Sequence, residues 1–208
     1  MVSKAEAQRR RERAAQMRKE AQRAERRQRT TRGAVIGAVS LAVVAGLVLA
    51  VVLTRGNGSS TPAIAGVKSY SNLSQNHVDG TVKYAQTPPV GGDHAPVWLN
   101  CGIYDKPVKN ENAVHDMEHG AVWITYQPTL ATSQISTLTS QVKGTTYVDL
   151  SPYPGLPAPV VASAWGKQLT LQSAGDPRLA QFISAYRQGP QTPEPGASCT
   201  GGTGTPTG

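Results

Sequence analysis

The four histidines are the residues of this 208-residue chain best suited to chemistry, and all of them lie within residues 77–119. His115 and His119 are four residues apart, so on a helix their side chains stand one turn apart and can grip one metal ion. His94 could supply a third nitrogen, and His77 could supply a fourth or orient another ligand. The spacing predicts a site for a divalent metal, either zinc or copper.

The segment His-Asp-Met-Glu-His at residues 115–119 also matches the His-x-x-Glu-His pattern of inverted zinc peptidases. In that hypothesis Glu118 activates water as the base of a hydrolase, whereas at a simple metal site it orients a ligand. Gly120 would end the helix at once, which leaves no downstream helical carboxylate to complete the usual ligand set. A third interpretation is a metal-free domain whose Glu and His side chains are simply solvated.

A short helix over about residues 111–119 must position this pair. At helical spacing His115 and His119 share one side with Glu111 and Glu118, while Val114 and Met117 fall on the opposite, apolar side. We therefore expect the two histidines to face away from the side of the helix that is buried.

Residues 67–188 are expected to form one α+β domain, a small and mostly antiparallel sheet with helices on one face. A helix should follow the Asp176-Pro177 cap, and a weaker helical pattern covers residues 130–142. Residues 55–66 are predicted to be a flexible linker, and the Gly-, Pro- and Thr-rich residues 189–208 a disordered tail. The expected strands, rich in β-branched and aromatic residues, are 122–126, 147–150, 160–165 and 169–171.

Cys101 and Cys199 are the only cysteines in the sequence. In an oxidising compartment an even count favours a disulfide, which would tie the C-terminal segment to the domain. A metal site made of the two cysteines is the alternative, but nothing in their spacing supports it.

The N-terminal part of the sequence predicts a membrane anchor. The run from Ala34 to Leu53 carries no charge and is long enough to span a bilayer, so residues 33–54 are expected to be a transmembrane helix. Arginines precede it more densely than they follow it, which places the tail 1–32 in the cytoplasm and the α+β domain outside the cell membrane. A cleaved signal peptide is disfavoured because its apolar core would be shorter.

The net charge of +8 resides entirely in residues 1–32, which hold 12 Lys and Arg against 4 Asp and Glu. The rest of the chain is neutral, which excludes a basic domain built to bind nucleic acid. The expected partners are anionic lipid headgroups at the basic tail and an envelope protein bound by the outer domain. With no complete catalytic set, a metal-free binding or scaffolding module of the cell envelope stays an alternative to metal binding.

Several of these residues form a longer pattern, which includes His77-x-x-Gly80, Gly91-Gly92-x-His94 and His115-x-x-Glu118-His119-Gly120. This pattern resembles a family known as domain of unknown function 3105, over about residues 67–199. The resemblance implies an outer domain behind one membrane anchor in actinobacteria and related bacteria. It implies a grouping of His94, His115 and His119 but no reaction.

Overall fold

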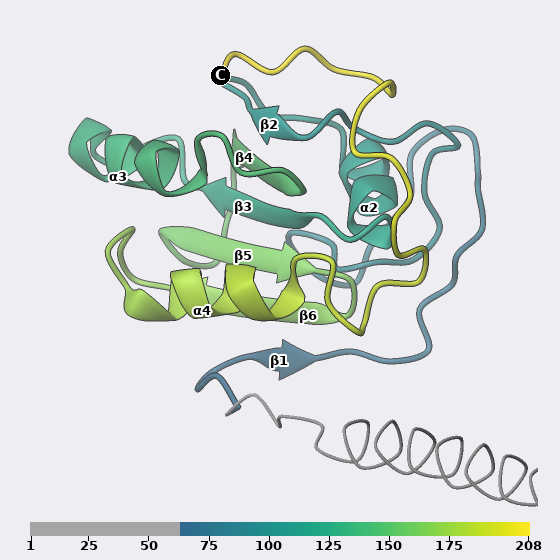
Figure 1. The fold of residues 1–208 in the computed structure, drawn as a ribbon, viewed down its shortest axis with the longest axis horizontal. Coiled ribbons are helices and arrows are strands. Elements are labelled where there is room, and N and C mark those ends of the chain that lie inside the picture. Colours follow the sequence, from purple (N-terminus) through teal and green to yellow (C-terminus); the bar gives the residue numbers. More distant parts are fainter. Residues whose placement is uncertain (1–62) are drawn as a thin grey trace, which may run out of the picture. The chain divides into compact units, whose positions relative to one another are not determined.

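The computed structural model describes residues 63–208 (Figure 1). The predicted basic tail, the predicted transmembrane helix 33–54 and most of the predicted linker lie outside these residues. Within residues 63–208, none of the helices combines the length and the apolar character needed to cross a membrane. The elements are β1 (Lys68–Ser69), β2 (Gly102–Ile103), α2 (Asn110–Glu118), β3 (Val122–Tyr126), α3 (Thr132–Val142), β4 (Val148–Pro152), β5 (Val160–Ala164), β6 (Lys167–Leu171) and α4 (Pro177–Tyr186).

The strands form one six-stranded sheet in the order β1-β6-β5-β3-β4-β2. β3 pairs in parallel with β4, and β4 pairs in parallel with β2. The other three pairings are antiparallel, and two of them, β3 with β5 and β5 with β6, join neighbouring long strands. The domain is therefore a mixed α+β fold, as predicted, with a sheet that is antiparallel on one side and parallel on the other.

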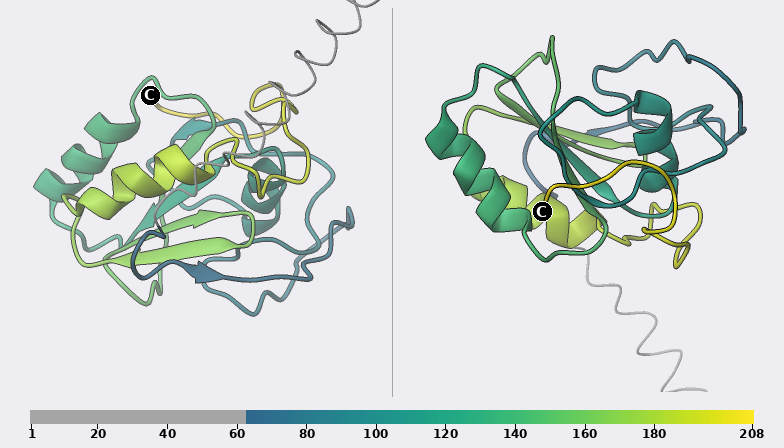
Figure 2. Two further views of the ribbon diagram at one scale, coloured as in Figure 1. Left: turned by 60° about the horizontal axis from the view of Figure 1, so that its bottom comes forward. Right: turned by 90° about the horizontal axis from the view of Figure 1, so that it is seen from above.

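α3 and α4 cover one face of this sheet, where they lie side by side (Figure 2). Their buried residues Leu138 and Phe182 share a core with Val122 and Ile124 of β3. α4 begins as its sequence indicates, because the Asp176 side chain accepts a hydrogen bond from the backbone N–H of Arg178 and Pro177 opens the first turn.

α2 packs on the opposite face, which corrects the expectation that the helices share one face. Trp123 lies between Val122 and Ile124, so its side chain points to the other side of the sheet. There it packs in a second core with Val114 and Met117 of α2. The difference arises because β3 directs Val122, Ile124 and Tyr126 to one face and the large Trp123 to the other, so both faces need a cover.

The C-terminal segment, residues 189–208, is also not the disordered tail that its composition predicts. It passes α2 and returns to the edge strand β2 (Figure 1). Backbone hydrogen bonds join Asn100 N–H to the Thr203 carbonyl at 2.8 Å and Thr207 N–H to the Ile103 carbonyl at 2.7 Å. The disulfide between Cys101 and Cys199 fixes the same segment covalently, as predicted. These tertiary bonds supply the order that the local sequence lacks, and they cover an otherwise open sheet edge.

Candidate metal centre

Helix α2 carries the centre and is buried on all sides. Val114 and Met117 face the core as predicted, but His115, Glu118 and the flanking His119 are also at most 4% exposed. The prediction that the polar side of this helix is solvated is wrong, because the loop before β2 and the C-terminal segment cover that side. Gly120, at a φ of +104°, ends the helix and lets the chain turn into β3.

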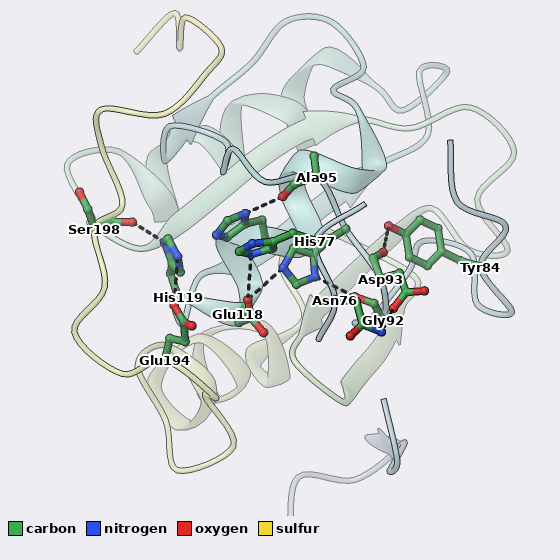
Figure 3. A network of polar contacts seen from close by, with 12 residues as sticks. Asn76, His77, Tyr84, Gly92, Asp93, Ala95, Glu118, His119, Glu194 and Ser198 are labelled. Carbon is green, nitrogen blue, oxygen red and sulfur yellow. Dashed lines mark hydrogen bonds and ion pairs between the residues drawn. The ribbon is translucent and has the colours of Figure 1, made fainter. Parts of the chain in front are cut away.

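Four side chains from three parts of the chain converge beside this helix. His77, His94, His115 and Glu118 each offer one donor atom, and these four atoms lie within 4.8 Å of one another. His94, His115 and Glu118 are buried, whereas the His77 side chain is 49% exposed at the mouth of the group. Figure 3 shows His77 and Glu118 facing each other at the centre of the group. We call these four residues the His/Glu cluster.

Backbone carbonyls fix how two of the imidazoles present their nitrogens. His94 Nδ1 lies 2.8 Å from the Gly92 carbonyl oxygen, and His115 Nδ1 lies 2.6 Å from that of Ala95. A carbonyl can only accept, so each Nδ1 must carry the hydrogen and donate it. In a neutral imidazole the other nitrogen, Nε2, then holds a lone pair. Metal-binding histidines are oriented in the same way, because the ring nitrogen that does not bind the metal donates its hydrogen to a nearby acceptor.

The pKa values of both histidines favour the neutral form. Burial lowers the pKa of His94 below its usual value, and burial lowers the pKa of His115 to about 4. The neighbouring histidines contribute to both of these shifts, since each added positive charge would repel the next. Near neutral pH both Nε2 atoms therefore carry lone pairs.

Glu118 faces one of these lone pairs directly. Its Oε2 lies 2.9 Å from His94 Nε2 and 4.0 Å from His77 Nε2. His94 Nε2 is fully buried and has no hydrogen-bond donor among the described residues. Burial and, to a smaller extent, the charge of Glu194 raise the pKa of Glu118 to about 7. Two acceptors this close require a positively charged group or a proton between them, so Glu118 is protonated here, and a cation could take the place of that proton.

A tethered loop holds the two upstream histidines in place. The Val78 N–H donates to the His94 carbonyl at 2.8 Å, and the His94 N–H donates to the Asn76 carbonyl at 3.0 Å, so His77 is clamped against His94. The Asp93 carboxylate accepts from Asn76 Nδ2 at 2.9 Å, and the Tyr84 hydroxyl donates to the Asp93 carbonyl at 2.8 Å (Figure 3). The loop therefore delivers both imidazoles as one unit.

The same loop is fastened to α2 itself. The Ala95 N–H donates to the Glu111 carbonyl at 3.3 Å, and Glu111 Oε1 accepts from the Val82 N–H at 2.9 Å. Asn112 Nδ2 donates to the Val97 carbonyl at 2.6 Å. Glu111 thus shares the helix with the cluster but anchors the loop and adds no donor atom to the group.

His119 lies next to the cluster but outside it. Its ring is 4.5 Å from that of His115, yet its Nδ1 donates to the Ser198 carbonyl at 2.6 Å and its Nε2 lies 3.6 Å from Glu194 Oε2 (Figure 3). Both partners belong to the C-terminal segment. The structure therefore brings together His77, His94 and His115 of the predicted ligands, and it adds Glu118 in place of His119.

This arrangement gives no support to the hydrolase hypothesis. The His-x-x-Glu-His pattern requires its two histidines to hold one zinc ion while the glutamate stays free to activate water. Here the donor atom of His119 faces the C-terminal segment, and Glu118 lies among the donors.

Two neighbours of the cluster, Trp98 and Ser198, belong to no motif that would mark them in the sequence as part of a site. The Trp98 ring lies 5.8 Å from that of His115 and 5.1 Å from that of His119, so it forms the wall between the cluster and the C-terminal segment. Ser198 lies 79 residues from His119 and contributes only a backbone carbonyl. No side-chain motif could have identified that contact, whereas the sequence favours a core or pocket-wall role for Trp98, which agrees with its position here.

A family model described as "Protein of unknown function (DUF3105)" matches residues 77–201, and the chain belongs to this family. The matched range contains the whole His/Glu cluster and both cysteines. The resemblance inferred from the sequence is therefore confirmed, and the family description assigns no reaction to it. Neither the curated proteins nor the solved structures contain a significant match to this chain.

Proposed function

We propose that this domain binds one divalent metal ion, zinc or copper, through the His/Glu cluster. The observation that carries the proposal is the convergence of imidazole and carboxylate donors, two of whose imidazole rings are already held in place by hydrogen bonds to the backbone. His94 and His115 give their Nδ1 hydrogens to backbone carbonyls, so each keeps a lone pair on Nε2, and that of His94 faces the Glu118 carboxylate. A cation there would satisfy the buried His94 nitrogen and the buried carboxylate together.

The donor set suits zinc or copper better than magnesium or calcium. Imidazole nitrogens favour zinc and copper, whereas magnesium and calcium take mainly oxygen ligands. In tetrahedral zinc sites bonds of roughly 2.0–2.1 Å place ligand atoms about 3.4 Å apart. The donors within 4.8 Å need only a small contraction to reach that spacing, and the half-exposed His77 is the side chain with most freedom to supply it.

The proposal includes the location predicted from the sequence, a single-pass cell-membrane protein with the metal-binding domain outside. The apolar run 34–53 and the basic tail before it support this location. Protease added to intact cells should then remove the domain and spare the N-terminal tail. Protection of the domain in intact cells would place it on the other side of the membrane.

Metal binding is tested by elemental analysis of the purified full-length chain and by titration of the chelator-treated protein with zinc and with copper(II). We expect about one equivalent of one of these metals in the parent, because the cluster offers one set of donors. His115→Ala should abolish tight binding, and Glu118→Gln should weaken it by about 10- to 100-fold.

His119→Ala is the matched control, because its imidazole touches that of His115 but lies outside the cluster. We expect this variant to keep one equivalent of metal. A parent that takes up neither metal, or an His115→Ala variant that is folded and binds as tightly as the parent, would refute the proposal. That result would favour the alternative, a metal-free scaffolding module. Cross-linking in the native membrane would then be the experiment to find its partner.

A further inference from the structure

The four members of the His/Glu cluster differ sharply in their exposure to solvent. His94, His115 and Glu118 are at most 3% exposed, whereas the His77 side chain is 49% exposed. Metal sites that serve only structural stability are closed by protein ligands, whereas sites that act on other molecules keep one coordination position open to them. The cluster combines three buried donors with one that an external molecule can reach.

His77 is also the least tightly held of the three imidazoles. The rings of His94 and His115 are fixed by hydrogen bonds from Nδ1 to backbone carbonyls. Within residues 63–208 the His77 ring makes no such hydrogen bond, and its Nε2 lies 4.0 Å from Glu118 Oε2. An exposed side chain that is held in this way can change its rotamer within nanoseconds.

The backbone that carries His77 does not need to move for this rotation. The Val78 N–H donates to the His94 carbonyl, and the His94 N–H donates to the Asn76 carbonyl, so the chain is fastened on both sides of His77. Rotation of one side chain therefore suffices to open the cluster, while the three buried donors keep their positions.

The His77 ring covers the two buried imidazoles. It stacks on the ring of His115, with the ring centroids 4.7 Å apart and the planes 23° from parallel. It meets the ring of His94 edge-on, at 5.0 Å and 73°. A His77 side chain that turns outward therefore leaves a flat space against His115. A second imidazole ring can enter that space from solvent, stack in the same way and offer its own nitrogen.

We propose that His77 is the displaceable ligand of the metal site, and that an imidazole-type ligand from solvent takes its place on the bound ion. This inference rests on the proposed metal binding and adds how the ion enters and leaves. The lone pair of the entering nitrogen forms a bond to the ion, the bond to His77 breaks, and that lone pair stays on the His77 nitrogen. Neutral imidazole replaces neutral imidazole, so no electron or proton is transferred.

The first test follows release of the metal from the full-length chain, loaded with zinc or with copper(II), to an excess of a chromophoric chelator. At about pH 8 free imidazole is mostly neutral, and the release rate should rise in proportion to its concentration. A closed site releases its ion only when the protein opens, at a rate that does not depend on the entering ligand. A release rate independent of the imidazole concentration would overturn the proposal.

His77→Ala and His115→Ala form a matched pair, because one removes an exposed imidazole and the other a buried one. We expect His77→Ala to lower the metal affinity by about tenfold or more, and free imidazole to restore most of that loss. Imidazole should restore nothing in His115→Ala, because the space that this variant leaves is covered by the rest of the domain. Restoration in both variants, or in neither, would contradict the proposed role of His77.

Metal uptake by the parent separates this proposal from the one on which it rests. If the parent takes up no metal, both are wrong. If the parent binds one equivalent and His77→Ala binds as tightly, the metal site stands with three donors and His77 is not a ligand. The half-exposed position of His77 favours a folded variant, and the release experiment on the parent needs no variant at all.

Discussion

Glu118 is the residue whose state depends most on whether a metal is bound. It lies 2.9 Å from a histidine nitrogen that has no hydrogen to offer, so without a cation it must hold a proton itself. Burial, together with the charge of Glu194, raises its folded pKa to about 7 from a usual value of 4.5, so the ionised carboxylate is costly in the folded protein. The buried carboxylate that would help to bind a metal ion therefore destabilises the metal-free protein near neutral pH.

This cost predicts how Glu118→Gln changes stability in the presence of a chelator. Between pH 4.5 and about 7 the folded parent binds more protons at Glu118 than the unfolded chain does, so its free energy of unfolding falls as the pH rises through this window. The amide that replaces the carboxyl group in the variant cannot ionise, and it can donate a hydrogen bond to His94. The variant should therefore gain on the parent with pH, by up to about 3 kcal/mol above neutral pH. Urea unfolding at about pH 5 and about pH 8 measures the difference.

His115 changes the free energy of unfolding with pH in the opposite direction. Its folded pKa of about 4 lies below the usual 6.5, so its contribution to stability is present above pH 6.5 and is lost as the pH falls toward 4. That loss is common to the parent and the Glu118→Gln variant and cancels in the comparison. A difference between them that does not change with pH would contradict the raised pKa of Glu118.

Among the elements, the loop that carries His94 is the one whose shape the site depends on most. Gly91 has a φ of +142°, and a Cβ there would lie 2.8 Å from Leu73 Cδ1 and 3.2 Å from the Trp165 ring. Trp165 packs in turn against the edge of the His94 ring at 6.0 Å. The loop can therefore hold its histidine only while residue 91 has no side chain.

Gly91→Ala should lower the free energy of unfolding by about 1–3 kcal/mol, because the added methyl meets a packed aromatic ring. It should also weaken metal binding, since the displaced loop carries two donors of the cluster. Gly175→Ala is the control, because a Cβ there meets nothing within 4 Å; it should change stability by less than about 0.5 kcal/mol. Denaturant unfolding and zinc titration measure both effects. Equal behaviour of the two variants would contradict this account of the loop.

For the molecule as a whole, the C-terminal segment acts as a strap that joins the disulfide, the β2 edge and the cluster. The disulfide connects residues separated by 98 positions. The Glu194 N–H donates to the Glu118 carbonyl at 3.1 Å, and the Ser198 carbonyl accepts from His119. A change in the conformation of the strap would therefore be transmitted to the cluster through the contacts at the end of α2.

Replacement of both cysteines by serine should lower the free energy of unfolding by about 2–5 kcal/mol, because the unfolded chain regains the entropy of a long loop. Thermal and urea unfolding of the double variant against the oxidised parent measure this loss. A change of less than about 1 kcal/mol would mean that the backbone pairing alone retains the segment.

The sequence determined those features that depend on neighbours along the chain. The strand 122–126, the cap of α4 at Asp176 and the end of α2 at Gly120 each follow from local periodicity or backbone geometry, and the structure confirms them. Local free energies suffice to fix these features. The disulfide is not local, but it followed from the even number of cysteines and the oxidising compartment that the predicted topology implies, since only two cysteines exist to pair.

Only the tertiary structure decided which residues form the cluster and which side of α2 is buried. The polar side of that helix is predicted to be solvated because its covers, the loop carrying His94 and the segment carrying Ser198, come from distant parts of the chain. The same long-range contacts turned His119 toward the strap and left Glu118 among the donors. A Gly-rich tail became ordered for the same reason, since its order comes from a disulfide and a strand edge that its own sequence does not contain.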